Sequence, residues 1–146
     1  CISDTRGHVD MVVPSYAGGG DNFYESHIAA AGEASSGEGR SYRVEALTLD
    51  DLVARAGQPP DFIKIDVEGH ELSVIRGGRN LFARRRPPLL IEVAGDPDAQ
   101  ESPARTLFAE LAALGYMPYT LRQDRIRPRE KGDDEVDYLF LPSENG

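Results

Sequence analysis

The sequence predicts an α/β fold in which strands and helices alternate and the last two strands run antiparallel. One observation is the order of the apolar patterns: strand, helix, strand, helix, strand, helix, then two strands with no helix between them. The other is segment 61–71, where a largely apolar strand ends in three carboxylates and a histidine. Open α/β sheets bind ligands where such strands end, so this segment is the place to search for chemistry.

The composition indicates a single globular domain, residues 1–146. Hydrophobic residues make up 40% of the chain, and 25 acidic against 16 basic residues give a net charge of -9. The 146 residues suffice for one domain with its own core. Because a negative field repels a phosphate backbone, no nucleic-acid partner is expected.

Cys1 is the only cysteine, which excludes an intrachain disulfide and a cysteine metal cluster. No stretch approaches the ~20 apolar residues of a membrane span, and no secretory signal is present. We therefore expect a cytoplasmic protein with no membrane partner. The chain starts without methionine, and Cys1-Ile2-Ser3-Asp4 resembles the end of a strand, so we also expect a partial chain.

The first predicted element is a strand over residues 8–13, where apolar and polar side chains alternate. With the turn at 4–7 before it, it is expected to form half of a hairpin. Residues 17–41 are rich in Gly, Ala, Ser and Glu and predict a flexible loop or a lid. The Gly18-Gly19-Gly20 run does not predict a phosphate loop, because no strand leads into it and no Lys-Ser/Thr pair follows.

A short strand over residues 42–47 and a helix follow. Thr48 is a good N-cap for this helix, which has acidic residues in its first turn and ends at Gly57. The next strand, 62–67, carries apolar residues on both faces and is predicted to be covered on both.

An amphipathic helix is predicted over residues 71–86. It contains Gly77-Gly78, which weakens a helix by roughly 1 kcal/mol per residue relative to alanine. We interpret the pair as a site of close packing between helix and sheet rather than of ligand contact.

A buried strand over residues 89–93 precedes the last helix, which starts at Ser102-Pro103 and ends at Gly115. Two final strands, 116–121 and 136–141, are separated by a charged segment. They are expected to be antiparallel because no helix connects them.

Three carboxylates are predicted to meet at one edge of the sheet. Side chains alternate along a strand, so Asp66 and Glu68 share a face with Lys64. Glu92 ends the following strand, which is expected to be a neighbour. Carboxylates placed close together raise one another's pKa or bind a cation, so the cluster suits general-base catalysis on a hydroxyl or binding of a divalent cation such as Mg²⁺ or Ca²⁺.

Structural roles compete with each functional one. Lys64 could simply neutralise Asp66, while Glu68 and Glu71 could serve the N-terminus of the next helix, the role that we favour for Glu71. His70 is a candidate general base because it titrates near neutral pH, but its position after the turn also suits an exposed side chain.

Four blocks of the sequence, in order and at suitable spacing, resemble the FkbM family of methyltransferases. They are residues 48–52, residues 61–72, Ile75-Arg76-Gly77-Gly78 and Leu90-Ile91-Glu92-Val93. Ser3-Asp4 with Gly7 is similar to the serine-aspartate turn of that family. The resemblance extends from Ser3 to about Val93, and beyond Val93 only the layout agrees.

The resemblance implies a class I methyltransferase fold, a Rossmann-like sheet that ends in an antiparallel strand pair and is here truncated at its N-terminus. It also implies S-adenosylmethionine as the methyl donor and O-methylation of a hydroxyl on a sugar or natural product. Asp66 would then lie beside the transferred methyl group, as both a catalytic and a cofactor-binding residue, and Ser3 and Asp4 would lie near the adenine. Glu68, Glu92 and His70 complete the expected catalytic set, and no metal ligand is assigned.

The chain departs from the family pattern in its first part. The family's glycine-rich loop after the first strand, and the acidic ribose-binding residue of the second, have no counterpart here. Those elements hold the cofactor through a helix N-terminus and close backbone approach. We therefore expect residues 1–146 to bind S-adenosylmethionine weakly or not at all. The alternative function is a non-catalytic binding or scaffold module. Such a module would form an oligomer or pair with another chain that completes the sheet.

Overall fold

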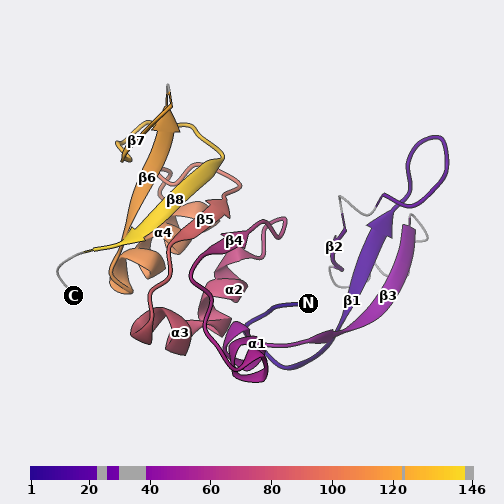
Figure 1. Cartoon of the computed structure of the whole chain (residues 1–146). Coiled ribbons are helices and arrows are strands. Elements are labelled where there is room, and N and C mark those ends of the chain that lie inside the picture. Colours follow the sequence, from indigo (N-terminus) through magenta and orange to yellow (C-terminus); the bar gives the residue numbers. More distant parts are fainter. Residues whose placement is uncertain (23–25, 30–38, 123, 144–146) are drawn as a thin grey trace.

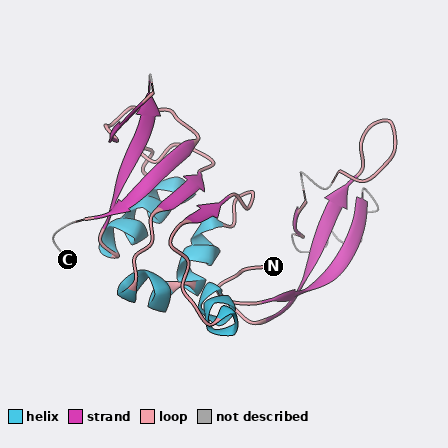
Figure 2. Ribbon diagram, in the orientation of Figure 1, coloured by secondary structure: helices cyan, strands magenta, loops and turns pink. Residues whose placement is uncertain are grey.

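The computed structural model describes residues 1–22, 26–29, 39–122 and 124–143, which form a mixed α/β structure with two sheets. Figure 2 shows one sheet packed with the helices and a second sheet that extends away from them. The helices are α1 (Leu49–Ala56), α2 (Glu71–Gly77), α3 (Arg79–Arg84) and α4 (Pro103–Ala113). The strands are β1 (Gly7–Pro14), β2 (His27–Ile28), β3 (Gly39–Ala46), β4 (Ile63–Ile65), β5 (Leu89–Glu92), β6 (Tyr116–Arg122), β7 (Arg125–Pro128) and β8 (Asp137–Pro142).

The larger sheet has the strand order β4-β5-β8-β6-β7. Strands β4 and β5 are parallel, whereas β8, β6 and β7 pair antiparallel with their neighbours. The predicted α/β class and the predicted antiparallel pairing of the last two long strands are therefore confirmed. Strand β7 was not predicted, and it forms a hairpin with β6 inside the charged segment.

One face of this sheet packs against helices. Phe108 of α4 makes edge-to-face contacts with Tyr138 and Phe140 of β8, at centroid distances of 5.1 and 5.0 Å. Figure 1 shows α2 and α4 behind the sheet. The fully buried side chains include Ile75, Phe82, Leu89, Ile91, Leu111, Tyr116, Tyr138 and Phe140.

The prediction that the strand over residues 62–67 is covered on both faces is wrong. Strand β4 is only three residues long and lies at the edge of the sheet, with β5 as its single partner among the described residues. Phe62 remains 51% exposed, and Lys64 is also exposed. The reason is the layer order of the fold, since the helices that pack on this sheet lie on the face opposite to Phe62 and Lys64.

The smaller sheet is an antiparallel ribbon in the order β2-β1-β3. Strand β1 pairs with β3 along its whole length, from Gly7↔Ala46 to Pro14↔Gly39. The predicted strand 8–13 and its place in a hairpin are thus confirmed, but its partner follows it instead of preceding the turn at 4–7. Strand β3 also starts earlier than predicted. Of the predicted loop 17–41, residues 27–28 and 39–41 are strand, and residues 23–25 and 30–38 lie outside the described residues.

The helix caps follow the sequence signals. The Thr48 hydroxyl accepts a hydrogen bond from the Asp51 N–H (3.1 Å), and the Asp51 carboxylate accepts one from the Thr48 hydroxyl (2.7 Å). Gly57 ends α1 with a φ of 76°. Ser102 caps α4, with Pro103 at its first position.

The predicted helix over residues 71–86 is two helices, because the chain leaves the helical conformation at Gly78. The Asp50 carboxylate of α1 stabilises the new N-terminus by accepting from the backbone N–H groups of Asn80 and Leu81, at 3.1 and 2.9 Å. The glycine pair is a close-packing site, but the prediction that it packs on the sheet is wrong, because its neighbours are the Ser3 backbone and residues of α1 and α3. A Cβ at Gly77 would lie 2.1 Å from the Ser3 carbonyl oxygen, and one at Gly78 would meet Phe82 and Leu49.

Candidate active site

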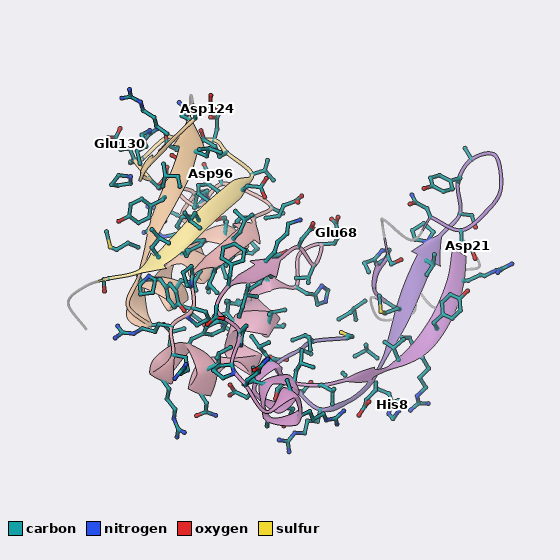
Figure 3. All side chains as sticks on the ribbon, viewed as in Figure 1. His8, Asp21, Glu68, Asp96, Asp124 and Glu130 are labelled. Carbon is teal, nitrogen blue, oxygen red and sulfur yellow. The ribbon has the colours of Figure 1, made fainter. Side chains whose placement is uncertain are left out.

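Three carboxylates meet where the parallel strands β4 and β5 end. Asp66, Glu68 and Glu92 line one small cavity of about 80 Å³, together with Gly69, Glu71, Ala94 and Val136. Figure 3 shows Glu68 on the loop that leaves β4. The predicted convergence of these three residues is therefore present in the structure, and it arises because β4 and β5 are parallel neighbours whose carboxyl ends share one edge.

Lys64 is the cation of this cluster. Its Nζ donates to Asp66 Oδ2 at 2.7 Å, across the point where β4 ends. The hydrogen bond to Asp66 raises the pKa of Lys64, with smaller contributions from the charges of Asp137 and Glu92. Both side chains of the pair are partly exposed, so the pair contributes little to stability and mainly fixes the position of Asp66.

Glu92 is the carboxyl group whose protonation the cluster changes. The negative charge of Asp66 raises the pKa of Glu92, and burial and the charges of Asp137 and Glu68 raise it further. Asp137 lies directly opposite Glu92 in the β5–β8 pair. A carboxylate with a raised pKa is a better proton acceptor than an ordinary one, which suits a secondary role in acid–base chemistry.

Replacing Lys64 with methionine is expected to raise the pKa of Glu92 further, because Lys64 is the group that lowers it. The pKa of Glu92 is higher in the folded protein than its ordinary value of 4.5. The contribution of Glu92 to the free energy of unfolding therefore falls as the pH rises from 4.5 through the raised pKa. In the Lys64→Met variant this loss of unfolding free energy should continue to a higher pH. NMR titration of the Glu92 carboxyl carbon measures the change.

Arg55→Met is the matched control, since it removes the cation of the exposed Arg55–Glu45 pair (3.3 Å). It should leave the titration of Glu92 unchanged. Identical Glu92 curves for Lys64→Met and the unmodified protein would show that Lys64 does not act on the cluster.

The turn after β4 is held in an uncommon backbone conformation. Glu68 has a φ of 49°, and Gly69 follows with a φ of 89°. The buried Glu71 carboxylate accepts from the Gly69 N–H at 2.8 Å and so closes the turn at the start of α2. Glu71 therefore has the structural role favoured from the sequence. A non-glycine residue at positive φ is strained, and such strain is concentrated at functional sites.

His70 lies at the N-cap of α2 and makes no side-chain cap hydrogen bond. Its Nδ1 is buried and has no hydrogen-bond partner within the described part of the chain. It does not line the cavity of Asp66 and Glu92. Its function as a general base stays a prediction.

Ser3 and Asp4 lie apart from the carboxylate cluster. The Ser3 N–H donates to the Leu47 carbonyl at 2.8 Å, and the Ser3 carbonyl packs on Gly77, the last residue of α2. The Asp66 cluster lies at the first turn of the same helix, since Glu71 lines its cavity. The two sets are thus at opposite ends of α2. Cofactor binding by Ser3 and Asp4 stays a prediction.

A divalent-cation site receives no support from the geometry. Within residues 1–22, 26–29, 39–122 and 124–143, no group of three or more His, Cys, Asp or Glu side chains is arranged to hold a metal ion.

Among the helices of the described residues, none is long and apolar enough to cross a membrane.

Sequence reasoning missed an ion pair next to the site. Arg129 donates two hydrogen bonds to Asp98, at 2.8 and 2.6 Å, and joins the segment after β7 to the segment before α4. A signal for the strand that positions Arg129 was present, because charged and apolar residues alternate from Arg125 to Arg127. Nothing in the sequence specified Asp98 as the partner.

The fold and the site define a class: a mixed α/β domain with carboxylates gathered where its two parallel strands end. Comparison with family models matches residues 1–118 to the methyltransferase FkbM domain, and the chain belongs to that family. The resemblance stated from the sequence is therefore confirmed. Searches among curated proteins and among solved structures found no match.

Proposed function

We propose that this chain provides the acceptor side of an S-adenosylmethionine-dependent O-methyltransferase that acts on a hydroxyl of a sugar or natural product. The observation that carries the proposal is the convergence of Asp66, Glu68 and Glu92 at the ends of β4 and β5 in a member of the FkbM methyltransferase family. The parallel β4–β5 pair, followed by antiparallel β8 and β6, supports a Rossmann-like sheet of the class I type.

In this proposal Asp66 orients and deprotonates the acceptor hydroxyl. Lys64 binds Asp66 Oδ2, which leaves Oδ1 for a hydrogen bond to the acceptor. Proton removal makes the oxygen a stronger nucleophile, and holding it in place supplies much of the rate. Glu92, with its raised pKa, is placed to share the proton. Glu68 contributes its charge from the strained turn.

The residues present do not fit the cofactor fully. S-adenosylmethionine supplies an electrophilic methyl group when it is bound, and a glycine-rich turn between a strand and a helix is the usual cradle for such a nucleotide-like group. The Gly18-Gly19-Gly20 run instead lies in the loop between β1 and β2, and the Gly69 turn carries the acidic Glu68. Calorimetry on this chain is accordingly expected to show a dissociation constant for S-adenosylmethionine of about 1 mM or weaker.

The test of the function follows a labelled methyl group. The protein is incubated with polyhydroxylated acceptors and with methyl-labelled S-adenosylmethionine at a concentration above the expected dissociation constant. Mass spectrometry then locates the isotopic label. The expected product carries the label on oxygen. A label found only on nitrogen, or no transfer above the uncatalysed background, would contradict the proposal.

One observation favours a second candidate, the non-catalytic module. Strand β4 has one edge that pairs with no strand of the described residues, and the exposed Phe62 and Leu52 lie together beside it. Such an apolar surface is of the kind that pairs with another chain. Sedimentation distinguishes the two. A stable oligomer that transfers no methyl group would support the module.

A further inference from the structure

A second cavity lies beside the carboxylate cluster. It has a volume of about 480 Å³, within the range of small-molecule sites, and opens between two segments. One wall is residues 93–98, which follow β5, and the other is residues 131–136, which precede β8. Figure 3 shows Asp96 on the first wall and Glu130 next to the second, both at the end of the larger sheet where Glu68 also lies.

We propose that this cavity binds the hydroxylated acceptor and that Arg129 is the positioning residue that holds its two walls together. The inference rests on the proposed function and names the place and the polarity of the acceptor site. We call residues 93–98 and 131–136 the acceptor walls.

The cavity adjoins the small cavity of the carboxylates. Val136 lines both the acceptor cavity and the small cavity of Asp66 and Glu92. The Val93 N–H donates to the Val136 carbonyl at 2.8 Å, so the two walls meet at this point. A ligand in the larger cavity therefore lies next to Val136, which also borders the cavity of Asp66 and Glu92.

Arg129 joins the walls through a two-point ion pair. Its guanidinium donates twice to Asp98, and the Gly132 N–H donates to the same carboxylate at 2.7 Å. These bonds lower the pKa of Asp98 from its ordinary value of 3.8 to about 2. The Arg129 side chain is only 10% exposed and lies over the Phe108 ring, 5.6 Å from its centroid. Planar two-point pairing and stacking of this kind fix geometry better than a single ion pair does.

The lining selects for hydrogen-bond donors. Among the described residues, five acidic ones line the cavity, Asp96, Asp98, Asp133, Asp134 and Glu135, against one lining cation, Lys131. Asp96 is exposed and therefore accessible to a ligand, whereas Glu135 is paired with Arg122. Carboxylates only accept hydrogen bonds, so the ligand groups that face them must donate. Val93, Pro97 and Val136 provide apolar surface for the carbon atoms of a ring. Together these features suit a neutral polyol or sugar and disfavour an anion.

The experiment is an NMR titration of the ¹⁵N-labelled protein with two matched probes, glucose and its anionic relative glucuronate. Glucose is expected to shift the amide signals of the acceptor walls, and glucuronate is expected to bind at least about tenfold more weakly. Shifts centred on another surface, equal affinities for the two probes, or no shifts with either would overturn the proposal.

Two variants test the residues. Asp96→Asn removes one negative charge and retains an oxygen to accept from the Asp98 N–H (2.8 Å), so it should narrow the preference for glucose over glucuronate without affecting the fold. Arg129→Lys retains the charge but loses the two-point pairing, and it should weaken glucose binding by about tenfold. Arg76→Met, which removes the Arg76–Glu110 pair between α2 and α4, is the control and should leave binding unchanged.

Unchanged probe preference in Asp96→Asn would overturn the lining argument, and unchanged affinity in folded Arg129→Lys would overturn the positioning role. Binding is measured without methyl transfer, so the two proposals fail separately. Sugar bound at the acceptor walls with no label transferred would contradict the methyltransferase alone. Label transferred to oxygen while the walls show no shifts would contradict the acceptor site alone.

Discussion

Asp66→Asn is expected to lower the rate of methyl transfer by about 10²–10⁴-fold, the usual contribution of a general base. The amide has nearly the same shape and retains an oxygen to accept from Lys64, so the turn after β4 should not move. What is lost is the negative charge to which the proposed mechanism assigns the orientation and deprotonation of the acceptor hydroxyl. The measurement is kcat/KM across a range of pH, together with the thermal midpoint.

Asp61→Asn is the matched control, because Asp61 is an exposed carboxylate at the opposite end of the same segment. It should leave the rate unchanged. Full activity of Asp66→Asn with an unchanged pH profile would remove Asp66 from the mechanism and move attention to Glu92 or His70.

Gly77→Ala is expected to lower the free energy of unfolding by at least roughly 1–3 kcal/mol, the usual cost of overpacking a core. The new Cβ would lie 2.1 Å from the Ser3 carbonyl oxygen. Ser3 cannot withdraw easily, because its N–H is bonded to the Leu47 carbonyl at 2.8 Å. Alanine improves helix propensity by about 1 kcal/mol, which offsets only part of the clash.

The shift in the urea midpoint measures this effect, provided that the slope of the transition is unchanged. Gly18→Ala is the control, because a Cβ there would meet nothing within 4 Å. A midpoint for Gly77→Ala equal to that of the unmodified protein would mean that residues 1–4 do not pack on α2 in solution.

Local signals in the sequence predicted much of the secondary structure. The caps at Thr48 and Ser102 and the alternation over residues 8–13 each depend on neighbours within a few positions, and each is present. The break at Gly78 was missed because its cause is distant in sequence: the Asp50 carboxylate, thirty positions before Asn80, accepts hydrogen bonds from the N-terminus of α3. The prediction that both faces of β4 are buried was wrong for a similar reason, because the position of a strand at the edge depends on the whole sheet.

The candidate site shows the same division. Strand order sufficed to place Asp66, Glu68 and Glu92 together, because parallel neighbouring strands end at one edge. Residue alternation did not contribute, since Asp66 and Glu68 follow the last residue of β4. The orientation of His70 and the separation of Ser3 from the cluster depend on how α2 packs, which no local pattern encodes. The Asp98–Arg129 pair likewise joins two loops whose meeting is a tertiary event.

Most of the residues that carry the family signature have structural contacts in this protein. Thr48 and Asp51 form a cap, Asp50 ties α1 to α3, and Gly77 admits the Ser3 backbone. Relatives that have lost catalysis should therefore keep these four residues, and genome surveys based on them will gather pseudoenzymes together with enzymes. Asp66 and Glu92 are the positions at which the two groups should diverge.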